Sequence, residues 1–116
     1  MKTKAAVESL SALAHEGRLA AFRLLVKAGP EGLPAGVLAR KLGAPPSSLS
    51  TSLAILTQAG LARSRRDGRS IIYTADFTQM GALMSFLVED CCGGAPEVCA
   101  PMMQAALACP PAGKRC

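Results

Sequence analysis

Residues 61–74 are the one stretch of this chain in which helical spacing of apolar residues gives way to an extended pattern. The stretch contains Asp67-Gly68, a pair typical of tight turns between antiparallel strands, and the strong strand formers Ile71, Ile72 and Tyr73. We therefore expect a β-hairpin. It is strongly basic, because only Asp67 offsets the charge of its arginines, which are Arg63, Arg65, Arg66 and Arg69.

Before the hairpin, apolar residues recur every three or four positions, as they do on one face of a helix. Between Ala5 and Ala28 this spacing predicts two helices with a break at residues 14–17, because Gly17 is a poor residue for a helix interior. A short helix is expected from Ala35 to Leu42, ended by Gly43 in the left-handed conformation.

A hydroxyl-rich helix is expected to start after Pro45-Pro46 and to close at Gly60. One of its faces is apolar and consists of Leu49, Leu53 and Leu56, whereas hydroxyl residues largely occupy the others. After the hairpin, helical spacing returns from Phe77 to Val88, which predicts a last helix that leads to Cys91 and Cys92.

This order of elements indicates a mainly α fold with a small β-hairpin, a winged helix-turn-helix. Its second helix and its wing would face DNA, and the side chains that we expect to contact DNA are Ser47, Ser48, Ser50, Thr51, Arg65, Arg66 and Arg69. Hydroxyl groups can form hydrogen bonds with phosphate oxygens and with several base edges, and they discriminate between bases less sharply than Arg or Asn. Alternatively, the serines are the solvent-exposed residues of an ordinary helix, and the arginines only make the tip of the hairpin soluble.

Length and charge agree with this interpretation. A chain of 116 residues with a net charge of +5 is expected to form one domain, residues 1–90, that suits an anionic partner, followed by a cysteine-rich tail, residues 91–116. Aromatic residues make up only 3% of the chain, which argues against single-strand binding by base stacking. An enzyme is not expected, because His15 is the only histidine that could activate a nucleophile. A membrane protein is not expected either, because the chain has no long apolar segment, and we expect a cytoplasmic protein.

All five cysteines follow Glu89, so we expect them to form a functional C-terminal segment rather than part of the core. Three of them, Cys91, Cys92 and Cys99, lie close enough in sequence for a short loop to bring their thiolates to one soft ion. No histidine accompanies them, and As(III) is satisfied by three sulfur ligands whereas Zn²⁺ normally takes four, so arsenite fits best. Sb(III) or a trivalent methylarsenical remains open as the effector, Cys109 and Cys116 remain unassigned, and a reversible disulfide would need no metal.

Three segments together resemble the ArsR/SmtB family of winged-helix metalloregulators. They are Leu13-Ala14-His15-Glu16-Gly17-Arg18-Leu19 with Phe22-Arg23-Leu24-Leu25, Ser47-Ser48-Leu49-Ser50-Thr51-Ser52-Leu53 leading to Ala59-Gly60-Leu61, and Arg65-Arg66-Asp67-Gly68-Arg69-Ser70-Ile71-Ile72-Tyr73. The resemblance covers residues 5–90 and implies a homodimeric repressor in which the first and last helices form the dimer interface.

Two departures from the family pattern bear on function. The Cys-x-Cys motif of the founding sensors is absent from residues 36–42; instead, Cys91, Cys92 and Cys99 are similar to the C-terminal triad of some arsenic repressors. The other departure is Thr51-Ser52, where relatives often carry Arg or His followed by His.

The resulting hypothesis is an arsenite-responsive repressor that binds double-stranded operator DNA as a homodimer and is released when As(III) binds the triad. Two rivals remain: a thiol-redox or persulfide-responsive repressor of the same fold, and a soft-metal-buffering module that does not bind DNA.

Overall fold

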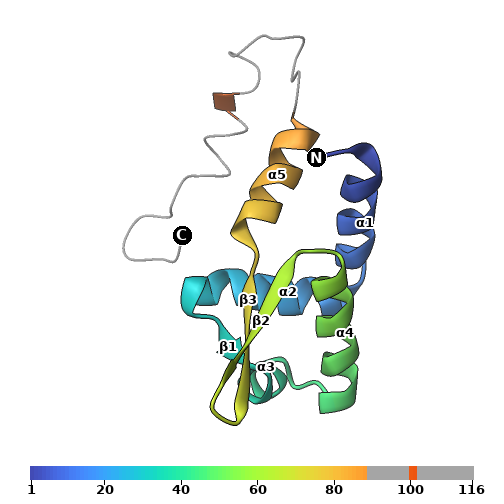
Figure 1. The fold of residues 1–116 in the computed structure, drawn as a ribbon. Helices are drawn as coiled ribbons and strands as arrows, with labels where there is room; N and C mark the ends of the chain where they lie inside the picture. Colours follow the sequence, from blue (N-terminus) through green and yellow to red (C-terminus); the bar gives the residue numbers. More distant parts are fainter. Residues whose placement is uncertain (89–99, 102–116) are drawn as a thin grey trace. The chain divides into compact units, whose positions relative to one another are not determined.

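The computed structural model describes residues 1–88 and 100–101 of the chain. The chain divides into two compact units, Met1–Phe86 and Leu87–Cys116, and nearly all described elements lie in the first (Figure 1). These elements are, in order, α1 (Thr3–Leu13), α2 (Glu16–Ala28), the 3-10 helix η1 (Gly29–Glu31), β1 (Leu33–Pro34), α3 (Ala35–Leu42), α4 (Pro46–Gln58), β2 (Ala62–Asp67), β3 (Ser70–Ala75) and α5 (Phe77–Leu87).

The helices confirm the predicted order. The short helix α3 has the expected bounds, and Gly43 ends it with φ 63° and ψ 28°, the left-handed conformation that glycine adopts without steric cost. The first helix begins at Thr3, two residues before the expected Ala5. The break between α1 and α2 falls at residues 14–15, within the predicted interval.

The sheet has three strands rather than the two of the predicted hairpin. Strand β1 pairs antiparallel with β3, Leu33 opposite Tyr73, and the strand order is β1-β3-β2. Strand β1 has only two residues, so it is too short to show an alternating apolar pattern in the sequence. In the hairpin, Asp67 pairs with Ser70, so Gly68-Arg69 forms the turn, one residue later than the Asp-Gly signal indicated.

The core is built mainly from aliphatic side chains of α2, α3, α4 and the residues at and just before the start of β2, together with Phe22 of α2. Leu25, Leu38, Leu56 and Leu61 have no exposed surface, and Leu53 is 1% exposed. The predicted inward face of α4 is confirmed, because Leu49, Leu53 and Leu56 are all buried. Burial of this leucine face fixes the rotation of α4 about its own axis and turns its hydroxyl residues outward.

The apolar faces predicted for α1 and α5 pack only in part within the chain. In α1 the small residues Ala6, Ser9 and Ala12 are buried, while Val7 and Leu10 are exposed. In α5 only Leu83 is buried. Three other large apolar residues of α5 remain exposed, namely Phe77, Met84 and Leu87. The periodicity thus identified both helices, but much of their apolar surface lies outside the core that the described residues form.

Gly32, between η1 and β1, is a position that only glycine can occupy. Its φ is 71°, and a Cβ there would collide with the carbonyl oxygen of Tyr73 and lie 2.5 Å from Cγ2 of Thr74. The close approach brings β1 against β3, which attaches the hairpin to the helices.

We expect Gly32→Ala to lower the free energy of unfolding by at least about 3 kcal/mol. The alanine would be strained in the left-handed conformation, and its Cβ would in addition collide with the backbone of Tyr73. Gly68→Ala is the matched control, since Gly68 has φ 63° but open space around it, and it should cost about 1 kcal/mol. Urea unfolding at one protein concentration measures both. Equal costs would contradict the steric role of Gly32.

Candidate DNA-binding surface

The outward face of α4 carries hydroxyl groups. Residues of an α-helix are about 100° apart, so Ser47 and Thr51 lie nearly opposite the buried leucines, with Ser48 and Ser50 on the two flanks. All four side chains are exposed. The structure therefore places all four predicted serine and threonine contacts on the solvent side of one helix.

The first turn of α4 has no side-chain cap. Pro45 occupies the N-cap position and makes no capping hydrogen bond, and Pro46 follows within the first turn. Backbone N–H groups at such a helix start, together with the helix dipole, suit an anion such as a DNA phosphate. The Thr51 hydroxyl donates to the Ser47 carbonyl oxygen at 3.2 Å, which leaves its lone pairs free to accept a hydrogen bond.

His15 caps α2 and is committed to that role. Its Nδ1 accepts hydrogen bonds from the backbone N–H groups of Gly17 at 3.1 Å and Arg18 at 3.3 Å. Its side chain lines a small pocket of about 170 Å³ together with Ser48 and Leu49 of α4.

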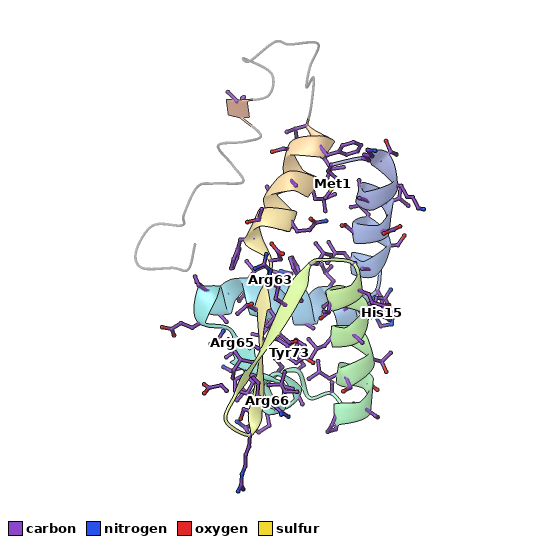
Figure 2. All side chains as sticks on the ribbon, viewed as in Figure 1. Met1, His15, Arg63, Arg65, Arg66 and Tyr73 are labelled. Atoms are coloured by element: carbon purple, nitrogen blue, oxygen red, sulfur yellow. The ribbon has the colours of Figure 1, made fainter. Side chains whose placement is uncertain are left out.

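The wing, defined as β2, β3 and the turn between them, presents its arginines to solvent (Figure 2). Arg63 lies at the end of the wing next to α5, and Arg66 lies toward the turn. Figure 1 shows this turn and the start of α4 at the same end of the chain's first unit. Arg66 and Arg69 have no ion-pair partner within the part of the chain that the structure describes.

Arg65, a predicted DNA contact, also has a structural role. Its guanidinium donates to the carbonyl oxygen of Glu31 at 3.0 Å. Arg65 lies opposite Ile72 in the β-ladder, and Ile72 lies opposite Pro34 of β1. The arginine therefore reaches across the middle strand on the face of Ile72, which is buried, and ties β2 to η1.

Arg63 is held by Asp76, the residue just before α5. Arg63 Nε donates to Asp76 Oδ2 at 3.0 Å, and the side chains are 71% and 15% exposed respectively. The sequence had indicated Asp67 as the compensating acid of the hairpin. Within residues 1–88 and 100–101 the ion pair instead uses Asp76, which lies outside the hairpin's turn.

Asp76 also caps α5, because its Oδ1 accepts from the N–H of Gln79 at 3.0 Å. This hydrogen bond is the main reason that the pKa of Asp76 lies below its ordinary value of 3.8; burial opposes it, and Arg63 adds to it. A signal for the cap was present in the sequence, since Asp76-Phe77-Thr78-Gln79 has the spacing of a capping box before an apolar helix. Sequence reasoning did not use it.

The predicted thiol ligands Cys91, Cys92 and Cys99 lie outside the described residues. Among residues 1–88 and 100–101, no group of three or more His, Cys, Asp or Glu side chains is placed to hold a metal ion. None of the helices in the same ranges has the length and apolar character needed to cross a membrane.

Comparisons with known proteins agree with this fold. A family model described as a helix-turn-helix domain matches residues 13–65. No curated protein matches the chain significantly by sequence.

Among solved structures, NolR from Sinorhizobium fredii is 34% identical, with a TM-score of 0.60 over 74% of this chain and 83% of that one. Reduced HlyU from Vibrio cholerae N16961 is 31% identical, with a TM-score of 0.61 over 78% of this chain and 92% of that one. An ArsR-like transcriptional regulator from Rhodococcus sp. RHA1 is 21% identical, with a TM-score of 0.68 over 90% of this chain and 93% of that one.

These likenesses join the family motifs in the sequence to the observed fold. The chain belongs to the same family of helix-turn-helix proteins as HlyU and NolR. Its fold is that of an ArsR-like regulator, in which α3 and α4 are the helix-turn-helix and β2 and β3 are the wing.

The lowered pKa of Asp76 predicts a pH dependence for the stability of this protein. Compared with Asp76→Asn, the wild type should gain about 1 kcal/mol at neutral pH from the ionised carboxylate. The gain is fully present above the ordinary pKa of 3.8 and is lost as the pH falls through the lower pKa of the folded state. Chemical unfolding of both proteins between about pH 3 and pH 7 measures it. A difference that stays constant over this range would refute the assignment.

Proposed function

We propose that this ArsR-like regulator is an arsenite-responsive repressor. It binds double-stranded operator DNA as a homodimer, and it is released when As(III) binds Cys91, Cys92 and Cys99. The observation that carries DNA binding is that the start of α4 and the turn of the wing lie at the same end of the domain (Figure 1). The first carries exposed hydroxyl residues, and the second carries Arg69 and follows Arg66, which are both exposed.

The chemistry of this surface matches that of DNA. The uncapped start of α4 offers N–H groups to a phosphate, and Ser47, Ser50 and Thr51 offer hydroxyls to phosphates or base edges. Arg66 and Arg69 contribute the positive charge that the outward face of α4 lacks. Much of the affinity should therefore come from the wing and depend on salt.

Exposed apolar residues of α1 and α5 support a homodimer. Val7 is 55% exposed, and Leu10, Met84 and Leu87 are also exposed. Large apolar side chains left without a partner on two helices are typical of an oligomer interface. The homodimeric winged helix-turn-helix domain Mb0332 from Mycobacterium bovis, a fold relative at 24% identity and a TM-score of 0.59, adds to this support.

We expect Arg66→Ala to weaken operator binding roughly fivefold at moderate salt and to lower the slope of log affinity against log salt by about one, because one phosphate contact is lost. Lys27→Ala removes the same charge from an exposed position of α2 and is the matched control. Fluorescence anisotropy with labelled duplex measures both. An equal effect of the two substitutions would mean that only net charge matters.

The effector proposal rests on the donor set in the sequence. Three thiolates suit As(III), which binds soft sulfur ligands and needs only three of them. AntR, an antimony-specific transcriptional repressor, has the same fold at 23% identity and a TM-score of 0.56, and it supports a metalloid effector. Sb(III) or a trivalent methylarsenical is the nearest alternative to arsenite.

We expect Cys99→Ser to bind the operator within about twofold of wild type but to lose most of its release by sodium arsenite, because one of three sulfur ligands is gone. Cys116→Ser is the control, since it removes a thiol outside the proposed triad, and it should respond as wild type does. Anisotropy of the operator complex during an arsenite titration is the measurement. Normal dissociation of Cys99→Ser would refute the triad.

A thiol-redox or persulfide-responsive repressor is the second candidate. HlyU, one of the relatives above 30% identity, has a structure described specifically as that of the reduced protein. A sensor of this kind would release DNA on oxidation and recover on treatment with a reductant, without bound metal. Titration with an oxidant beside arsenite separates the two repressors. Membership of a family of transcriptional regulators disfavours the soft-metal-buffering module.

A further inference from the structure

Asp76 makes four hydrogen bonds that join the wing to the start of α5. Its backbone N–H donates to the carbonyl oxygen of Leu61 at 2.8 Å, and its own carbonyl oxygen accepts from Met80 N–H at 3.0 Å. Its two carboxylate oxygens hold Gln79 N–H and Arg63 Nε, each at 3.0 Å. One residue therefore fixes the direction in which α5 leaves the sheet and the position of an arginine on the neighbouring strand.

The base of the wing packs into the core through Ala62, Tyr73 and Ala75, but the wing has few other polar contacts with the helices. Strand β1 pairs with β3 only at Tyr73 and Ile72, so beyond these residues the two wing strands pair only with each other. Within the described residues, the wing's other side-chain hydrogen bond to the helical part of the domain runs from Arg65 to Glu31, on the side of η1. A short two-stranded hairpin does not hold a fixed direction by itself, so contacts at its base must set its pose.

We propose that Asp76 is a positioning residue for DNA recognition. By holding Arg63, it sets the pose of the wing relative to α5, and this pose brings Arg66 and Arg69 to DNA in register with α4. The inference rests on the proposed DNA binding and adds a residue that does not itself contact DNA. It also assigns Arg63 to the alignment of the wing rather than to the DNA contact surface.

The proposal and simple electrostatics predict opposite effects of removing the carboxylate. Asp76→Asn removes a negative charge beside the wing and frees Arg63, so charge alone would strengthen binding to any duplex. If Asp76 positions the wing, the same variant binds its operator less well than wild type while its binding to unrelated duplex is unchanged or stronger. Asparagine is itself a good N-cap residue, so α5 keeps its cap.

The test compares affinities for two duplexes of equal length and composition at one salt concentration. One carries the site that wild type enriches from a random library, and the other is its shuffled version. The ratio of the two affinities should fall at least about fivefold in Asp76→Asn. Asp67→Asn, which removes the same charge at the exposed end of β2 beside the wing's turn, should leave the ratio unchanged.

A second comparison shows whether Asp76 acts through Arg63. Arg63→Gln should lower the ratio as Asp76→Asn does, and the double variant should be no worse than either single one. All measurements are made well below the unfolding temperature of the least stable variant, so that a role in stability alone leaves the ratio unchanged. An unchanged ratio in Asp76→Asn, or additive losses in the double variant, would overturn the inference.

Failure of the proposed function would be visible in wild type. A wild-type protein with no salt-dependent affinity for either duplex would refute DNA binding, and the inference with it. A wild-type protein that prefers its site, together with an Asp76→Asn variant of equal preference, would overturn the positioning role alone.

Discussion

The burial of one leucine face of α4 is the constraint on which the rest of this structure depends. Leu53 and Leu56 are almost fully enclosed by α2, α3 and the start of β2, and rotating α4 by even a quarter turn would bring hydroxyls into that core. A buried hydroxyl without a partner is costly, so the orientation of the outward face follows from the packing of the inward one. The chemistry of the proposed DNA-binding face is thus set by side chains that never reach the surface.

Most of the fold could be predicted because its signals are local. The bounds of α3 follow from Pro34 and Gly43, and the inward face of α4 follows from the spacing of its leucines. Strand β1 could not be predicted, because its two residues are extended only through pairing with β3, far away in sequence. The same holds for Arg65: its sequence context indicates a basic hairpin, but only the folded chain brings it to the carbonyl of Glu31.

The apolar periodicity of α1 and α5 predicted the helices but not what covers them, because such a pattern indicates that a face is to be buried without indicating its partner. Val7 and Met84 satisfy the helical pattern, yet both remain exposed in the single chain. The four wing arginines likewise look alike in the sequence but differ in their contacts. The side chains of Arg63 and Arg65 are hydrogen-bonded to residues outside the wing, and among the described residues those of Arg66 and Arg69 are not. Pattern alone cannot make that division, since it depends on where distant oxygens lie.

The aliphatic core has one more consequence, for how such a regulator changes over evolution. Within residues 1–88 no cysteine takes part in the core, since all five cysteines follow Glu89. Substitutions that remove or move one of these thiols therefore leave the residues of that core unchanged. Under the proposed function, a lineage would exchange one inducer for another by changing the last quarter of the chain, while the helix-turn-helix scaffold is inherited intact.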